Sequence, residues 1–269
     1  MRVMRLGLPS SILLLWLGMA VFGPLLDLQP DHIELSRILV SPGADAWLGY
    51  DDLGRPLWDR LVVGARTSLF VALWVVMISA LMGTAIGTAG AYMGGAWDHV
   101  IVRIIDIFLA FPGILLAIAM AGLLGPGVDN VIIALSTVGW VGFARLARAQ
   151  VLSIKQRLHV EAAVAMGVRQ VRIVVRHILP LTLAPLIVEA SFAVAGVVIA
   201  EAGLSFLGLG VQPPAASWGS IIRDGTRYML VAPHMVLAPG IILMLVVLAV
   251  NLLGDHLRDW VDVRTRRVL

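Results

Sequence analysis

Apolar residues gather along this chain into six long runs, separated by polar or glycine- and proline-rich stretches. A helix needs about 20 mostly apolar residues to cross the hydrocarbon core of a bilayer, where its backbone groups must bond to one another. The pattern therefore predicts an all-α, polytopic membrane protein. Its six transmembrane helices are expected at residues 10–28, 67–93, 102–124, 131–151, 181–203 and 233–253.

The distribution of basic residues predicts how these spans are oriented. Lys and Arg collect in the short loops on the cytoplasmic side of membrane proteins. If the N-terminus lies inside, fourteen of the twenty basic residues fall on the inner side. The six on the outer side are Arg37, Arg55, Arg60, Arg66, Arg223 and Arg227. Both termini are therefore expected in the cytoplasm.

The first span also has features of a signal peptide, because Arg2 and Arg5 precede an apolar run. The run continues past residue 21 to Leu26 without an A-x-A-like cleavage site. We therefore expect an uncleaved anchor helix.

Composition supports the membrane assignment and excludes several other classes. Hydrophobic residues make up 59% of the chain and charged residues only 14%, against about 25% charged in soluble domains. Cysteine is absent, so disulfides and thiolate chemistry are excluded. The net charge is only +3 and the arginines are dispersed, which argues against a nucleic-acid partner.

The inner loop before the fifth span carries a basic, helix-like segment, EAAVAMGVRQVRIVVRHILP, at residues 161–180. Apolar residues at helical spacing predict that one face is formed by Val160, Val164, Gly167, Val168, Val171, Val174 and Ile178. Two interpretations stay open. A basic amphipathic helix can lie on anionic headgroups, or it can dock in a partner protein. Gly167 favours docking, because glycine weakens a helix by about 1 kcal/mol but allows a sharp turn.

Three stretches resemble the transmembrane permease subunits of ABC importers. The inner-loop residues that match the EAA loop of that family are Glu161, Ala162, Ala163, Gly167, Leu179 and Pro180. LGYDDLGR at 48–55 with GARTSL at 64–69, and EAGLSFLGLG at 201–210, are similar to signatures of the C-type permeases for dipeptides, oligopeptides and nickel. The resemblance covers nearly the whole chain.

This resemblance implies an ABC type I importer permease fold in a bacterial cytoplasmic membrane. Residues 1–66 would form an anchor helix and a periplasmic loop, and residues 67–269 the permease core with a cytoplasmic EAA coupling loop at about 152–180. The implied partners are a second homologous permease, two ABC ATPase subunits and an extracytoplasmic substrate-binding protein. Arg169 and Arg172 would contact an acidic rim of the ATPase.

The residues themselves place ATP hydrolysis on another polypeptide. A P-loop needs Gly-Lys-Ser/Thr, and the only lysine, Lys155, stands between Ile154 and Gln156. The histidines form no H-x-x-x-H pair, and no G-x-S-x-G or HExxH motif occurs. We therefore expect no enzyme activity and no cofactor or metal on this chain, with ATP and Mg on the partner subunits.

Few ionisable residues lie within the predicted spans. Arg103 and Asp106 are three residues apart and are expected to form a structural pair on one helix face. Glu189 and Glu201 stand twelve residues apart, about 18 Å along a helix, and cannot share one small ligand. Glu201 and Ser205 belong to the third matching stretch. Each glutamate could line the pathway or form a helix–helix hydrogen bond.

Close helix packing is predicted for the second span, because small residues recur there at four-residue intervals among its glycines, Gly83, Gly87, Gly90, Gly94 and Gly95.

Three functional hypotheses remain at this point. The leading one is an ABC importer permease for dipeptides or oligopeptides. The second is a permease for nickel or a metal chelate, and the third is a proton-coupled secondary transporter that uses Glu189 or Glu201.

Overall fold

The computed structural model describes the backbone of residues 2–44 and 46–266 and the side chains of residues 7–44 and 46–261. The side chains of Arg2 and Arg5 lie outside the described residues. The α-helices are α1 (Arg2–Phe22), α2 (Leu57–Met93), α3 (Gly95–Leu109), α4 (Gly113–Leu124), α5 (Val128–Ile154), α6 (Leu158–Ala165), α7 (Gln170–Ile173), α8 (Leu179–Phe206), α9 (Trp218–Thr226) and α10 (His234–Arg266). Short 3-10 helices occur at Gly23–Leu25 and Leu35–Arg37, and a π-helix at Val174–Ile178.

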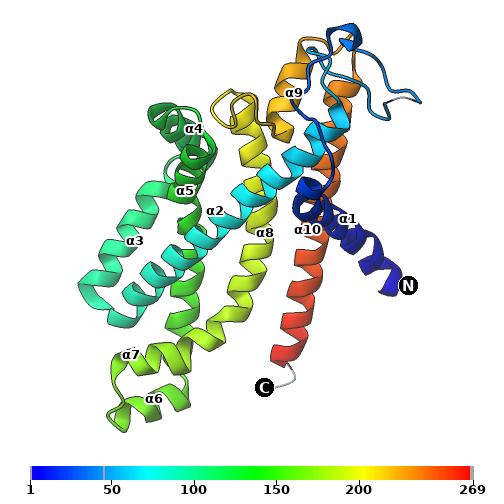
Figure 1. Ribbon diagram of the computed structural model, residues 1–269. Helices are drawn as coiled ribbons and strands as arrows, with labels where there is room; N and C mark the ends of the chain where they lie inside the picture. The colour runs from blue at the N-terminus through cyan, green and yellow to red at the C-terminus, as the bar shows by residue number, and fades with distance from the viewer. Residues whose placement is uncertain (1, 45, 267–269) are drawn as a thin grey trace.

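The long helices α2, α5, α8 and α10 run between two ends of the molecule (Figure 1). At one end lie α9 and the loop that precedes α2. At the other end lie α6 and α7, together with the C-terminal end of α10. We call these the α9 end and the α6 end. The loop before α2 and the segment with α6 and α7 therefore lie at opposite ends of the bundle. The predicted six-span topology also places these two segments on opposite sides of the membrane.

Five described helices are long and apolar enough to cross a membrane individually, and the third predicted span differs from a straight helix. It consists of α3 and α4, whose axes bend by 85° at the break. The physical reason is Pro112, which caps α4. A proline lacks the backbone N–H for a continuous helix and disfavours helical geometry in the residue before it.

The core of the bundle is formed where α2 crosses α5. A Cβ added at Gly83 would lie 2.3 Å from the carbonyl oxygen of Trp140, and one at Gly87 would lie 2.1 Å from that of Ala144. Any side chain at either position would thus collide with the backbone of α5. This confirms the close helix packing predicted from the glycine spacing, since only glycine lets the two backbones approach so closely.

Two tryptophans connect α1, α2 and α9. The indole Nε1 of Trp16 donates to the carbonyl oxygen of Ala65 at 3.1 Å, and that of Trp218 donates to Leu61 at 3.1 Å. The ring centroids of Trp16 and Trp218 lie 6.0 Å apart. The anchor helix, α1, is therefore packed into the bundle.

The expected division between an N-terminal part (residues 1–66) and a permease core (residues 67–269) falls inside a continuous helix, because α2 begins at Leu57.

A buried ion-pair cluster fixes the loop before α2 at the α9 end. Asp51 is 1% exposed and accepts hydrogen bonds from Arg55 Nε at 2.7 Å, from Arg60, and from the backbone N–H of Leu53 at 2.9 Å. Arg60 also lies 3.8 Å from Asp224 of α9. The carboxylate thus ties the loop to two helices, and its charge is compensated within the protein.

Candidate functional site

The turn that joins α6 to α7 is built around Gly167. This residue has φ +72°, a left-handed conformation that glycine adopts without a Cβ penalty. Its N–H donates to Val164 at 2.9 Å, and the N–H of Val168 donates to Ala163 at 3.1 Å. These two hydrogen bonds form a Schellman motif, which ends α6 and satisfies carbonyls at its C-terminus. The residue that the sequence singled out therefore reverses the chain direction.

One side of this element, which we call the coupling element (residues 158–178), packs on the ends of α2 and α5. The buried residues of this contact are Val160, Ala163, Ile173 and Ile178 from the coupling element, with Ala91 of α2 and Val151 and Ile154 of α5. Lys155 adds a hydrogen bond from its Nζ to the carbonyl oxygen of Ala91 at 3.0 Å. The coupling element is thus seated on the bundle rather than hanging from it.

The opposite side of the coupling element is an exposed surface that mixes apolar and basic groups. Its exposed apolar members are Leu158, Val164, Met166, Val171 and Val175. The exposed positions around them include Glu161, Ala162, Arg169, Arg172 and Arg176. Basic and apolar groups that project together from the end of a bundle suit either anionic lipid headgroups or the groove of a partner protein.

The predicted apolar face of this segment was partly wrong. Val164 is 57% exposed and Val171 75% exposed, whereas Ala163 and Ile173, which were not assigned to that face, are buried. A single helical period through residues 160–178 assumes one straight axis. The turn at Gly167 gives α7 a different axis, so the spacing of α6 does not carry into α7. Val164 lies before this turn, and it is exposed because the buried face of α6 is formed by Val160 and Ala163, three residues apart.

The coupling element is continuous with the next span. After α7 the chain forms a π-helix, and α8 begins at Leu179 with Pro180 in its first turn. Proline is tolerated there because the first-turn N–H groups lack intrahelical partners. Residues Gln170–Phe206 together qualify as one membrane span. α7 is therefore joined to α8 by continuous helical backbone.

His159 and His177 form a contact that the sequence analysis missed. Their ring centroids lie 6.4 Å apart, across the coupling element. No local spacing rule could reveal this pair, because the reversal at Gly167 brings the two residues together.

Glu201 occupies a sealed junction between α8 and α2. It is 1% exposed and accepts hydrogen bonds from Ser68 Oγ at 3.0 Å and from Ser205 Oγ at 2.8 Å. Ser205 Oγ in turn accepts from the N–H of Val211 at 3.3 Å. Of the two roles left open, this geometry fits the helix–helix hydrogen bond.

Arg103 and Asp106 do not pair in the described structure. Both residues are exposed on α3, and no ion pair between them occurs among the described residues. Asp98 instead makes a bidentate contact with Arg148 of α5, with Nε to Oδ1 at 2.6 Å and Nη2 to Oδ2 at 2.8 Å. Arginine forms such a planar fork readily with a carboxylate. The ion pair therefore joins two helices rather than two turns of one.

The second intramembrane carboxylate, Glu189, is half-buried on α8. Its Oε1 lies 3.2 Å from the point where a Cβ at Gly142 of α5 would stand. Its side chain forms no hydrogen bond or ion pair with the part of the chain that the structure describes.

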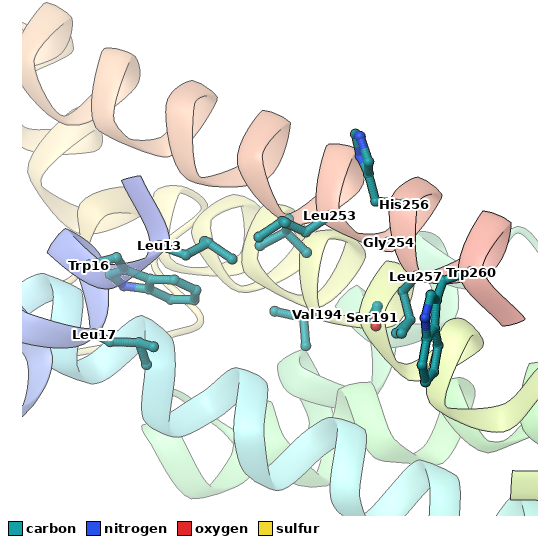
Figure 2. A pocket seen from close by; sticks show the side chains of 11 residues that line it. Leu13, Trp16, Leu17, Ser191, Val194, Leu253, Gly254, His256, Leu257 and Trp260 are labelled. Atoms are coloured by element: carbon teal, nitrogen blue, oxygen red, sulfur yellow. The ribbon is translucent and has the colours of Figure 1, made fainter. Parts of the chain in front are cut away.

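A lateral groove of about 740 Å³ lies between α1, α8 and α10 (Figure 2). Leu13 and Leu17 of α1 face Val194 of α8 and Leu253 of α10 across it, while His256 and Trp260 lie toward one end. The lining is almost entirely apolar and includes no carboxylate. It suits a hydrophobic occupant and supplies no acid–base pair.

Comparison with known proteins agrees with this architecture. The dipeptide transport system permease protein DppC of Alkalihalophilus pseudofirmus is 43% identical over 245 residues, covering 90% of this chain and 80% of that protein. The glutathione transport system permease protein GsiD of Escherichia coli O6:K15:H31 is 43% identical over 232 residues, covering 86% and 77%.

A solved structure shares the fold. It is an inward-facing conformation of the MetNI methionine ABC transporter, with a TM-score of 0.58 and 22% identity, covering 77% of this chain and 98% of the matched chain. Residues 62–267 match the family described as binding-protein-dependent transport system inner membrane component. With this match and the two relatives, the chain belongs to that family and is a multi-pass, non-catalytic permease subunit of an ABC importer with the type I fold.

Proposed function

We propose that this permease imports dipeptides or oligopeptides. The support is chemical agreement between two relatives, one named for dipeptides and one for glutathione, which is itself a short peptide. In this proposal the chain forms half of the translocation pathway and a second homologous permease forms the other half. Two ABC ATPase subunits bind ATP and Mg, and an extracytoplasmic binding protein delivers the peptide.

The observation that carries the coupling role is the two-sided coupling element. Its inner side is buried on α2 and α5, and its outer side exposes basic and apolar groups. Such an element can bind an ATPase on one side and move the bundle on the other. Closure of two ATP-bound ATPases would displace α7, and with it α8, between inward-open and outward-open arrangements.

This role requires the α6 end to face the cytoplasm. Both chain termini would then be cytoplasmic, in agreement with the distribution of basic residues. The α9 end, with the loop fixed by Asp51, would face the periplasm and receive the binding protein.

The proposal is tested by reconstituting the complete importer in proteoliposomes. Binding protein loaded with a labelled dipeptide is added outside, and ATP is enclosed on the ATPase side. We expect uptake that requires both ATP and the binding protein. Labelled glutathione and labelled nickel are compared in parallel, and uptake of nickel without peptide would replace the peptide assignment.

A second measurement addresses the source of energy. The isolated chain is placed in liposomes under a proton gradient without nucleotide. Peptide uptake there would contradict coupling through partner ATPases and would favour a proton-coupled transporter.

A further inference from the structure

We infer that Glu189 lines the translocation pathway and binds the ammonium group of the passing peptide. The inference rests on the proposed peptide import, and it concerns a residue outside the coupling element.

The position of Glu189 along α8 places it deep in the membrane. It stands ten residues after the start of α8 at Leu179, which is about 15 Å at helical rise. Its neighbour Gly142 stands twelve residues before the end of α5 at Ile154, about 18 Å. Since the hydrocarbon core is about 30 Å thick, both residues lie near its middle.

A carboxylate at this depth needs a compensating group or water. Charged side chains in membrane spans face the bundle interior or a hydrated cavity, because lipid cannot solvate them. Glu201 on the same helix satisfies this rule with two serine hydroxyls. Glu189 has no side-chain hydrogen bond or ion pair within the described residues, although it is only half-buried. Its compensation must therefore come from outside those residues.

The surroundings of Glu189 combine one close neighbour on α5 with an uncovered stretch of its own helix face. Oε1 lies 3.2 Å from the point where a Cβ of Gly142 would stand, so a larger residue at 142 would crowd the carboxylate. Seven residues toward the α9 end, Gly196 has no atom within 4 Å of the position of a Cβ. The face of α8 that carries Glu189 is thus uncovered by the described chain at Gly196, about 10 Å farther along the helix.

Two groups from outside this chain could compensate the Glu189 carboxylate: the ammonium group of a peptide, or a basic side chain of the companion permease. The ammonium group fits the site better. Conduction requires binding that is favourable enough for entry and weak enough for release. A carboxylate without supporting hydrogen bonds provides such weak binding. A permanent ion pair in a low-dielectric interior would instead need further hydrogen bonds around it. Because α8 moves with the coupling element, ATP-driven movement would also change what Glu189 faces.

The first test uses the complete importer with Glu189→Gln and Glu189→Asp. A charge-assisted hydrogen bond predicts a loss of about tenfold or more in the initial uptake rate of a free-amine dipeptide for Glu189→Gln. Glu189→Asp retains the charge and is expected to lose much less. Both variants should still copurify with the companion permease and the ATPase subunits, which shows that the complex assembles. Ser191→Ala, which changes a residue on the groove side of α8, serves as the matched control.

The second test measures access to water. The chain contains no cysteine, so Glu189→Cys introduces its only thiol. We expect a charged, membrane-impermeant thiol reagent to modify residue 189, at a rate that changes when the ATPases are trapped with nucleotide. Ile187→Cys, at an apolar position that is 53% exposed in the described chain, should remain unmodified. Modification is measured by mass spectrometry of this chain alone, so that thiols of the partner subunits do not contribute to the signal.

Three results would overturn the inference: normal uptake by Glu189→Gln, an unreactive thiol at residue 189, or loss of the companion permease from purified Glu189→Gln complexes. The last would assign Glu189 to subunit pairing. Failure of the peptide-import proposal itself is distinct, because it would appear as absent dipeptide uptake by the wild-type importer.

Discussion

The turn at Gly167 allows a test of coupling in which backbone conformation is separated from bulk. Gly167 has φ +72°, and no atom lies within 4 Å of the position where a Cβ would stand. Gly167→Ala therefore introduces no clash, and its cost is the left-handed conformation alone. That cost is about 1–2 kcal/mol, which lowers the population of the turn about 5- to 30-fold relative to other conformations.

The measurement titrates ATPase subunits against the permease complex and records binding-protein-stimulated ATP hydrolysis. For Gly167→Ala we expect the half-saturating ATPase concentration to rise by up to about 5- to 30-fold, with normal membrane insertion. Gly167→Asn should rise less, because asparagine tolerates the left-handed region. Gly167→Arg adds bulk and charge to the exposed surface and should abolish coupling.

The control is Gly122→Ala, at a helical glycine of α4 that also has open space around it. It should leave the titration unchanged. Equal losses for Gly167→Ala and Gly167→Asn would refute the conformational explanation, and wild-type behaviour of Gly167→Arg would refute docking through this surface.

Three further predictions concern stability and are checked by thermal unfolding in detergent. Gly87→Ala should destabilise the protein by about 1–3 kcal/mol, because its Cβ would lie 2.1 Å from a carbonyl oxygen of α5. The control variant Gly122→Ala should be neutral or stabilising. Equal effects of the two substitutions would contradict the packing explanation. Asp51→Ala should cost about 3–5 kcal/mol, since it leaves buried arginines unpaired, and a loss below about 1 kcal/mol would argue against the buried network. Burial and neighbouring carboxylates raise the pKa of Asp52, so the folded state binds its proton more tightly. Stability should therefore fall as the pH rises from the unfolded-state pKa through the raised one, and Asp52→Asn should remove this dependence; an unchanged profile would contradict the assignment.

The turn at Gly167 was predictable because the residue that forms it acts locally. Gly167 stands out as a helix-weakening residue within a basic helical stretch, and a turn is what such a residue permits. The apolar period alone did not place the exposed side of α6, because this helix buries Val160 and Ala163 and exposes Val164. The pair of His159 and His177 depends on the reversal at Gly167.

The sequence by itself determined the solvent and the order of the elements. Long apolar runs specify membrane helices because no other open backbone is satisfied in lipid, and the basic loops predict the direction of these helices. The glycines of α2 identified a close packing face.

Only the tertiary structure decided which ionisable groups are compensated. Glu201 and Glu189 look alike along the chain, yet one accepts hydrogen bonds from Ser68 and Ser205 and the other lies beside Gly142 without a partner in the described chain. Asp98 pairs with Arg148, although Arg103 and Asp106 are closer together in sequence. The reason is physical: the cost of a charge depends on the groups within a few ångströms, and those groups come from helices that are distant in the chain.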